Sequence, residues 1–258
     1  MGSSGPVDAS TSSRMSTLSD ELAVTRQVRR HLEDLIAEPA QLGPDYQPIR
    51  RLADDEIAGW QVAGRGQATG DRADLPTLLR AARSLGLAER LDWTFRCLAF
   101  ERAIAGGLTE PLHIRPSVAV YGTVAPPRLA VAFSRARAQV KVVAEVHEAA
   151  WDQPTLVTTG VEEFRRWGWD VAVGDLSGRQ DFGSLLQKVK PKVAAVDLST
   201  PGRSNDDNVK RYVETAHRLG IETIAIGVDS PLRRGEAVAL GLTLARGRAI
   251  GELVDPTA

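Results

Sequence analysis

Short apolar runs alternate with amphipathic segments over most of this chain, and this alternation constrains the fold more than any other feature. The runs are rich in Val, Ile and Ala and are bounded by Gly, Pro and Asp, which is typical of β-strands. The segments between them carry apolar residues at helical spacing. Strands that alternate with helices predict a mostly parallel sheet. The predicted strands are Tyr46–Leu52, Ile57–Val62, Leu112–Arg115, Val140–Val146, Val171–Val173, Val193–Asp197, Ile221–Val228 and Leu242–Ala245.

About eight strands in roughly 240 residues favour a closed (β/α)₈ barrel over an open sheet, so the predicted fold class is α/β. The first two strands flank the acidic turn Ala53–Glu56, which predicts a β-hairpin at the start of the barrel. No glycine-rich dinucleotide fingerprint follows the first strand, and no P-loop occurs anywhere, which disfavours nucleotide sites of those two kinds. The predicted helices are Leu75–Leu85, Leu91–Ile104, Arg128–Arg137, Val161–Trp167, Phe182–Val189, Asn208–Leu219 and Pro231–Leu240.

Three parts are expected along the chain. Residues 1–14 are rich in Ser and Gly and lack apolar periodicity, and we expect them to be an expression leader. Residues 15–40 are predicted to hold an amphipathic helix over Thr17–Ile36, with Asp20 completing a capping box, and residues 41–258 the barrel. Either this helix packs across an end of the barrel, or it serves dimerisation or signalling.

Composition limits the partners and the compartment. The formal net charge of −1 gives no reason to expect nucleic acid or an anionic membrane as a partner. No apolar run approaches the roughly 18 to 20 residues that span a bilayer, and no secretory signal follows Met15, so we expect a cytoplasmic protein. The single cysteine, Cys97, lies in an apolar helical segment, which predicts a buried, unreactive thiol.

Acidic residues follow three successive predicted strands. Glu145 and Glu148 lie at the end of one, Asp175 follows the next, and Asp197 ends the third. Polar residues at the C-terminal ends of barrel strands face the functional site. A single acidic residue at the end of a strand could simply be exposed to solvent. Acidic residues at the ends of three successive strands instead define a candidate pocket.

Several segments become informative when they are read in order along the chain. They are Tyr46–Ile49, Trp60–Arg65, Glu145–Glu148, Gly174–Gly178, Val196-Asp197, Ile226–Asp229 and Arg246-Gly247. Their order and spacing resemble the EAL family of cyclic-di-GMP phosphodiesterases, from about Glu33 to Leu253. The segment Tyr46–Ile49 (YQPI) is the best individual match. This resemblance implies a barrel of the EAL type with an initial β-hairpin.

The resemblance also implies that the first strands have lost metal ligands. The signature Glu-Ala-Leu, whose glutamate binds metal in the family, matches Gln61-Val62-Ala63 here. The metal-binding asparagine of the family matches Arg115. The Glu-x-x-Glu pair is retained as Glu145 and Glu148.

The later strands show further replacements when they are compared with the family. The Asp-Asp pair that holds both metals has become Gly174-Asp175, so only the second acid remains. The lysine thought to orient the attacking water falls on Ala195, two residues before Asp197. A family glutamate falls on Ile226, and the glutamine of the last strand falls on Arg246.

These replacements matter together because two-metal hydrolysis needs oxygen ligands around two divalent cations about 4 Å apart. Gln61 lacks the charge of a carboxylate, and Gly174 offers no side-chain ligand at all. Arg115 stays protonated and would repel a cation beside it. We therefore expect no catalytic residues, no cofactor and no metal pair. A single metal held by Glu145 and Asp175 is one alternative, and an ion pair between Glu145 and Arg115 on adjacent strands is the favoured one.

Loss of catalysis does not exclude ligand binding, because arginines can hold phosphate without metal. Arg65 matches a ligand-contacting arginine of the family, and Arg246 and Arg248 follow the last strand, where barrels often bind phosphate. The alternative for these three is a solvated surface position.

The sequence therefore predicts a catalytically inactive EAL-like domain with a regulatory or protein-binding role, acting on a protein partner or as a homodimer. Tryptophans at Trp167 and Trp169 either mark an interface or pack at the end of a helix. The second interpretation is a metal-free sensor of cyclic-di-GMP or another anionic nucleotide, and the third is residual phosphodiesterase activity.

Overall fold

The computed structural model describes residues 9–68 and 71–257. Of the expected leader, residues 1–8 lie outside the described part of the chain, and residues 9–14 belong to helix α1 (Ala9–Ala37). The predicted start of this helix at Thr17 is therefore wrong. Neither Gly nor Pro occurs between Ala9 and Thr17, so nothing in this stretch interrupts helical hydrogen bonding.

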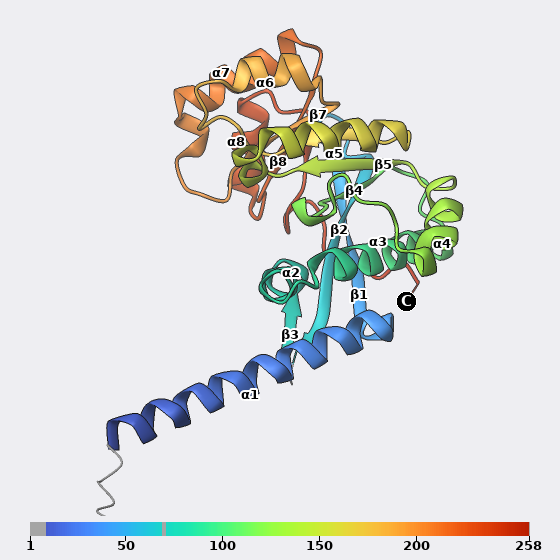
Figure 1. The fold of residues 1–258 in the computed structure, drawn as a ribbon. Helices are drawn as coiled ribbons and strands as arrows, with labels where there is room; N and C mark the ends of the chain where they lie inside the picture. Colours follow the sequence, from blue (N-terminus) through green and yellow to red (C-terminus); the bar gives the residue numbers. More distant parts are fainter. Residues whose placement is uncertain (1–8, 69–70, 258) are drawn as a thin grey trace, which may run out of the picture.

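A closed barrel forms the body of the molecule, as the sequence predicts (Figure 1). Among the described residues, eight strands follow one another in the order β1-β9-β8-β7-β6-β5-β4-β2, and pairing of β1 with β2 completes the ring. β1 is antiparallel to both of its neighbours, and the other neighbouring strands are parallel. The strands are β1 (Leu42–Arg51), β2 (Ile57–Ala68), β4 (Leu112–Ile114), β5 (Val142–Val146), β6 (Asp170–Val173), β7 (Val193–Asp197), β8 (Glu222–Ile226) and β9 (Leu244–Ala245).

The predicted hairpin is longer than expected and carries an additional strand. β1 and β2 pair from Leu42↔Gly66 to Arg50↔Ile57. The additional strand β3 (Asp71–Asp74) pairs with the far end of β2 and lies outside the ring. Its sequence, DRAD, has almost no apolar content, so hydrophobic alternation could not have predicted it.

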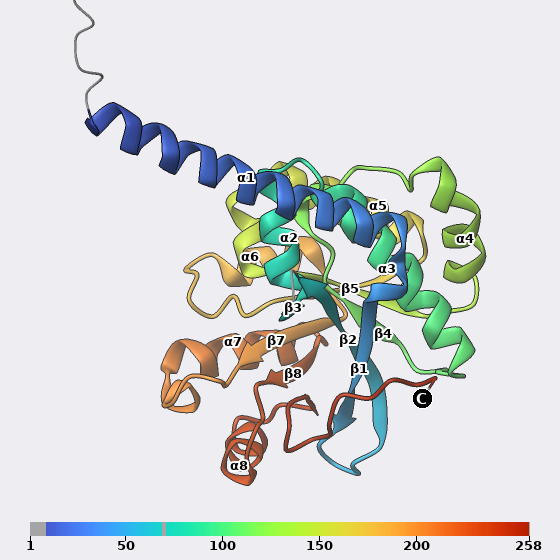
Figure 2. The same ribbon diagram turned by 90° about the horizontal axis from the view of Figure 1, so that it is seen from below.

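Helices cover the outside of the barrel (Figure 2). Each predicted helix is present, although the fifth in the chain begins at Pro154 rather than Val161, because Pro fits the first turn of a helix. The α-helices after α1 are α2 (Leu75–Ser84), α3 (Ala88–Ala105), α4 (Pro127–Arg137), α5 (Pro154–Arg166), α6 (Phe182–Val189), α7 (Asp207–Arg218) and α8 (Pro231–Ala239). Short 3₁₀ helices are η1 (Pro39–Gln41), η2 (Val118–Val120), η3 (Glu148–Asp152) and η4 (Arg203–Asn205).

A small apolar cluster fills the barrel interior, separate from the larger core between strands and helices. Its buried members are Ile49, Val143, Ala172, Val193, Ala195, Ile224 and Leu244. Side chains alternate between the two faces of a strand. Residues two positions later, such as Glu145 after Val143 and Arg246 after Leu244, therefore face the interior one layer nearer the strand ends.

The C-terminal part of α1 packs against the body of the molecule. Leu32, Leu35 and Ile36 are buried in a cluster with apolar residues of α2 and α3. The opposite part of α1 extends away from the barrel (Figures 1 and 2). Packing therefore accounts for the apolar residues in the last turns of this helix.

Trp169 and the single cysteine are core residues, and the half-buried Trp167 packs against the core. The ring of Trp167 contacts the rings of Trp93 and Phe133, which favours the interpretation that both tryptophans pack at the end of a helix. Cys97 is buried as predicted, and burial raises the pKa of its thiol to about 11. No helix in the described ranges is long and apolar enough to cross a membrane.

Candidate functional site

Glu145 lies at the centre of the strand-end site and contacts three nitrogen-bearing side chains. Its Oε1 lies 3.5 Å from Nδ1 of His113. Its Oε2 lies 3.5 Å from Nη2 of Arg115 and 3.6 Å from Nη2 of Arg246. The predicted contact between Arg115 and Glu145 is thus confirmed, and Arg246 is a second arginine on the same oxygen.

The two arginines differ in their exposure. The side chain of Arg115 is 44% exposed, whereas that of Arg246 is 9% exposed, as is that of Glu145. An ion pair weakens where water screens it, so Arg246 is the stronger partner. The alternative of a solvated surface position is therefore wrong for Arg246.

The charges around Glu145 decide its ionisation. Burial alone would raise the pKa of this carboxyl, but the charge of Arg246, together with His113 and Arg115, outweighs burial and leaves the pKa well below its usual range. Burial also lowers the pKa of Arg246, although Glu145 opposes that effect. Glu145 is a carboxylate at neutral pH, and arginines already compensate its charge.

Asp175 follows the neighbouring strand β6, and its carboxylate also accepts hydrogen bonds from protein groups. Its Oδ1 accepts hydrogen bonds from the backbone N–H and the hydroxyl of Ser177 at 2.9 and 2.6 Å. Its Oδ2 accepts from Nη2 of Arg203 at 2.6 Å and from the backbone N–H of Asp197 at 3.1 Å. Both oxygens of this carboxylate are therefore engaged by the protein.

The other predicted positions are scattered around this site. Glu148 begins η3 and is exposed, and Asp197 is exposed and accepts from the backbone N–H of Ser199. Ala195 is buried in the interior cluster, with Ile226 packed against it. Gly174 donates its backbone N–H to the carbonyl of Val146.

Arg65 and Arg248 lie nearer to solvent. Arg65 forms an ion pair with Asp45, and its side chain is 48% exposed. Arg248 is 73% exposed, and its Nη2 lies 3.7 Å from Asp229. A solvated surface position describes Arg248 well.

The residues present do not fit the metal pair of a two-metal phosphodiesterase. Nε2 of Gln61 donates to the carbonyls of Val62 and His113 and so holds this side chain against the backbone. Glu145 and Asp175, the two candidate metal ligands, each contact arginine. In the part of the chain that the structure describes, no three His, Cys, Asp or Glu side chains are grouped to hold a metal ion. A cation here would have to displace guanidinium groups, which cannot lose their charge.

A cavity of about 560 Å³ opens beside Gln61 and Arg246, between the strand ends and helices α2 and α3. Arg83, Arg96 and Arg115 also line it. Its apolar lining includes Leu75, Leu79, Phe95, Ile114 and Tyr121. Apolar walls with a few polar groups are typical of small-molecule sites.

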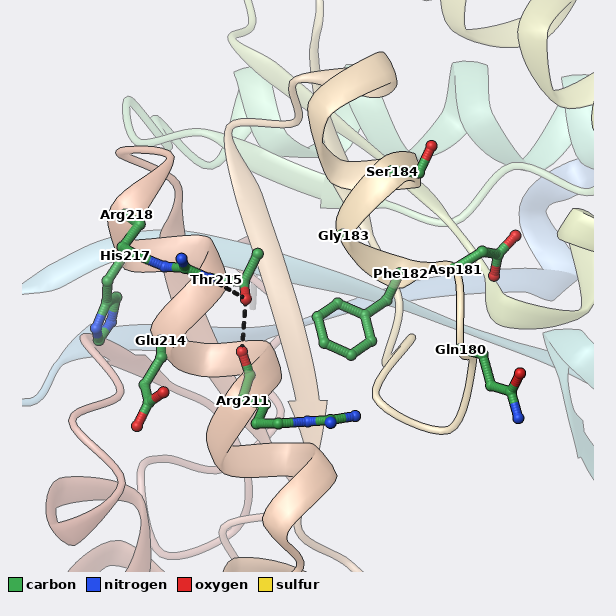
Figure 3. A pocket seen from close by; sticks show the side chains of 10 residues that line it. All are labelled: Gln180, Asp181, Phe182, Gly183, Ser184, Arg211, Glu214, Thr215, His217 and Arg218. Carbon is green, nitrogen blue, oxygen red and sulfur yellow. Dashed lines mark hydrogen bonds between the residues drawn. The ribbon is translucent and has the colours of Figure 1, made fainter.

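A second hollow of about 920 Å³ lies on the outer surface between α6 and α7 (Figure 3). Within it, Nη2 of Arg218 donates to the hydroxyl of Thr215, which donates to the carbonyl of Arg211. None of its lining residues belongs to the strand-end site, so we assign no chemistry to it.

Sequence reasoning missed two partners of the acids. His113 lies two residues before Arg115, and on a strand this spacing puts both on one face, so alternation could have indicated it. Arg203 comes from η4, after β7, and no local pattern connects it with Asp175. Asp45, the partner of Arg65, could have been found only from the hairpin register.

Comparisons with known proteins agree with the barrel fold. The family model of the EAL domain matches residues 29–252. The structure of the Xanthomonas citri FimX EAL domain in complex with c-diGMP is 16% identical, with a TM-score of 0.74, and the match covers 91% of this chain and 96% of that one. The FimX EAL domain from Pseudomonas aeruginosa bound to c-di-GMP is 18% identical, with a TM-score of 0.72 and coverage of 90% and 98%.

The match to the Vibrio cholerae LapD S helix-GGDEF-EAL structure has a TM-score of 0.69 at 18% identity. It covers 88% of this chain but only 57% of that one, so this chain spans less than three fifths of its length. At such identities the structural matches show the fold alone. A comparison with curated proteins finds no match. The family model nevertheless covers most of the sequence, and the chain belongs to the EAL-domain family.

Proposed function

We propose that this chain is a catalytically inactive EAL domain that acts as a regulatory or protein-binding module. The observation that carries the proposal is the pair of arginines, Arg115 and Arg246, on the carboxylate of Glu145. A carboxylate in this position would be a metal ligand in a two-metal site. Here its negative charge is offset by fixed guanidinium groups.

The chemical consequence concerns the attacking water. Two-metal hydrolysis depends on cations that activate water and stabilise both the attacking and the leaving oxygen. Arginines can hold phosphate oxygens, but they do not bring a water molecule to the phosphorus as a hydroxide. A folded barrel with this site therefore acts through binding, to a protein partner or to a second copy of the chain.

Incubation of the chain with cyclic-di-GMP and Mg²⁺ or Mn²⁺ tests the proposal. We expect no linear dinucleotide product by chromatography. Glu145→Gln is the control, because it removes the central carboxylate. Turnover by the wild-type chain that Mn²⁺ stimulates, and that this variant lacks, would establish residual phosphodiesterase activity and overturn the proposal.

A second candidate is a metal-free sensor of cyclic-di-GMP or another anionic nucleotide. The cavity beside Arg246 favours it, since four arginines and two aspartates line this space and leave an excess of positive charge. Calorimetry in the presence of a chelator tests this candidate separately from hydrolysis. Binding without turnover would support a sensor, and no binding would leave the protein-binding module.

A further inference from the structure

The charges of this chain are distributed unevenly, although its net charge is close to zero. Residues 111–144 contain no acidic residue, and this is the longest such stretch in the chain. They contain four arginines and one lysine, so this segment carries a formal charge of +5 and the rest of the chain carries −6. Three of the arginines belong to helix α4. The positive charge of this segment is therefore concentrated on one helix.

The solvent-facing side of α4 has an apolar residue at its centre. Both views place α4 at the edge of the molecule (Figures 1 and 2). The buried residues of this helix are Phe133 and Ala136, and the ring of Phe133 packs edge-on against Trp93. On a helix with about 3.6 residues per turn, Val131 lies on the side opposite Phe133. Val131 is 80% exposed, in a position where surface helices usually carry a polar residue.

Arginines flank Val131 on this exposed side. Arg128 comes three residues before it and Arg135 four residues after it, a spacing that places all three on one face of the helix. Both arginines are exposed. In the described part of the chain, neither they nor Arg137 form an ion pair or donate a side-chain hydrogen bond. We call Arg128, Val131 and Arg135 the α4 face. A second exposed valine, Val124, precedes the helix and is 77% exposed.

The chemistry of the α4 face indicates what it can bind. A guanidinium group binds a carboxylate through two parallel hydrogen bonds. The valine between the two arginines adds apolar surface whose burial is favourable. An amphipathic helix with carboxylates and apolar side chains matches both features. Nucleic acid is a poorer match, because the α4 face has no aromatic side chain on which bases could stack.

We propose that the α4 face binds an acidic amphipathic helix of a partner protein. This inference rests on the proposed function, because it names the surface and the partner chemistry of the protein-binding module. α4 has 11 residues and is about 16 Å long, so the contact is smaller than a standard protein interface and the complex is transient. The α4 face does not line the strand-end cavity, so this binding needs no ligand there.

Fluorescence anisotropy of the full chain with labelled synthetic peptides tests the inference. One peptide forms a helix of about five turns with Leu on one face and Glu on the other, and the second has Lys at each Glu position. We expect the Glu peptide to bind. The Lys peptide should bind at least about tenfold more weakly, because it brings like charges together. Added salt should weaken binding of the Glu peptide, because it screens the arginines.

Charge reversal on the chain gives the matched comparison. Arg128→Glu with Arg135→Glu should weaken binding of the Glu peptide at least about tenfold. The control is Arg211→Glu with Arg218→Glu on α7, where two exposed arginines have the same spacing but Glu214 lies between them (Figure 3). This control should leave the affinity unchanged.

Val131→Ser tests the apolar part of the α4 face. It should weaken binding of the Glu peptide several-fold, because it removes apolar surface that the peptide covers. Leu232→Ser on α8 is the control, since Leu232 is 72% exposed on another helix, and it should leave the affinity unchanged. Both residues are exposed, so neither change should alter the thermal midpoint. A loss of binding in Val131→Ser would then not result from unfolding.

Three results would overturn the inference: no binding of the Glu peptide, equal binding of the two peptides, or an equal loss in the α4 and α7 charge reversals. Tighter binding to phosphatidylserine vesicles than to the Glu peptide would assign the α4 face to a membrane and would overturn it too. Product analysis with cyclic-di-GMP separates these outcomes from the proposed function. Hydrolysis would overturn the proposed inactivity alone, whereas failure of the Glu peptide to bind would overturn the α4 face alone.

Discussion

At the scale of single residues, the centre of the barrel is an ion-pair cluster. The carboxylate of Glu145 has three nitrogen-bearing neighbours, His113, Arg115 and Arg246. The cost of removing one member depends on how deeply its partner is buried. A buried partner that is left alone has neither water nor an opposite charge to stabilise it.

Unfolding in urea should reveal this coupling. Glu145→Gln and Arg246→Gln should each lower the free energy of unfolding by about 3 to 5 kcal/mol, because each leaves a buried charge unpaired. The double variant should lose less than the sum of the two. Arg115→Gln is the comparison and should cost under about 1 kcal/mol, because its side chain is 44% exposed. Strictly additive losses for Glu145 and Arg246 would show that they do not interact.

The pKa of Glu145 makes a separate prediction about acid. Its folded pKa lies below the unfolded value of about 4.3, so its contribution to stability is fully present above that pH and is lost as the pH falls toward the folded pKa. Between about pH 5 and 3, wild type should lose stability more steeply than Glu145→Gln. The difference should reach at most about 1.4 kcal/mol per pH unit.

Asp181→Asn is a suitable comparison for this experiment. Arg179 lowers the pKa of Asp181 through a hydrogen bond, but the side chain is 53% exposed. Asp181→Asn should therefore lose stability with falling pH almost as steeply as wild type does. Identical slopes for wild type and Glu145→Gln would contradict an ionised, paired carboxylate at the barrel centre.

At the scale of elements, α1 shows how one helix can have two environments. Its last turns contribute Leu32, Leu35 and Ile36 to a cluster with α2 and α3. Val24, farther from the barrel, is 60% exposed. Apolar spacing predicted the helix, whereas only the neighbouring helices decide which of its apolar residues stabilise the fold.

Two alanine substitutions in α1 distinguish these environments. Leu35→Ala should lower the free energy of unfolding by about 2 to 5 kcal/mol, because it leaves a cavity in a buried cluster. Val24→Ala should change it by less than about 0.5 kcal/mol. Chemical denaturation measures both. A similar large loss in both variants would mean that the outer part of α1 is buried, as in a dimer.

At the scale of the whole molecule, the closed barrel brings two arginines, Arg115 and Arg246, to the carboxylate of Glu145 at the ends of its strands. Thermal unfolding with increasing Mn²⁺ measures whether a cation binds the folded chain, because any ligand of the native state raises the midpoint. We expect no change with Mn²⁺ or with a chelator. A midpoint that rises with Mn²⁺, and does not do so in Asp175→Asn, would support a single metal at Glu145 and Asp175.

The sequence determined the local features of this protein. Alternation of apolar residues predicted all eight barrel strands, and the ends of those strands located Glu145, Asp175 and Asp197. The adjacency of two predicted strands was enough to pair Arg115 with Glu145. Strand β3 could not be predicted in this way, because its four residues are mostly polar and show no hydrophobic pattern.

Only the tertiary structure decided which distant residues meet. Arg246 follows β9, which β6, β7 and β8 separate from β5, yet it reaches Glu145 through the interior of the closed barrel. Arg203 reaches Asp175 from a 3₁₀ helix, and Arg96 faces the cavity from α3. The physical reason is that the position of a residue within its strand alone decides on which face of the strand its side chain lies. Contacts across a barrel depend instead on how all the strands close, which no single segment encodes.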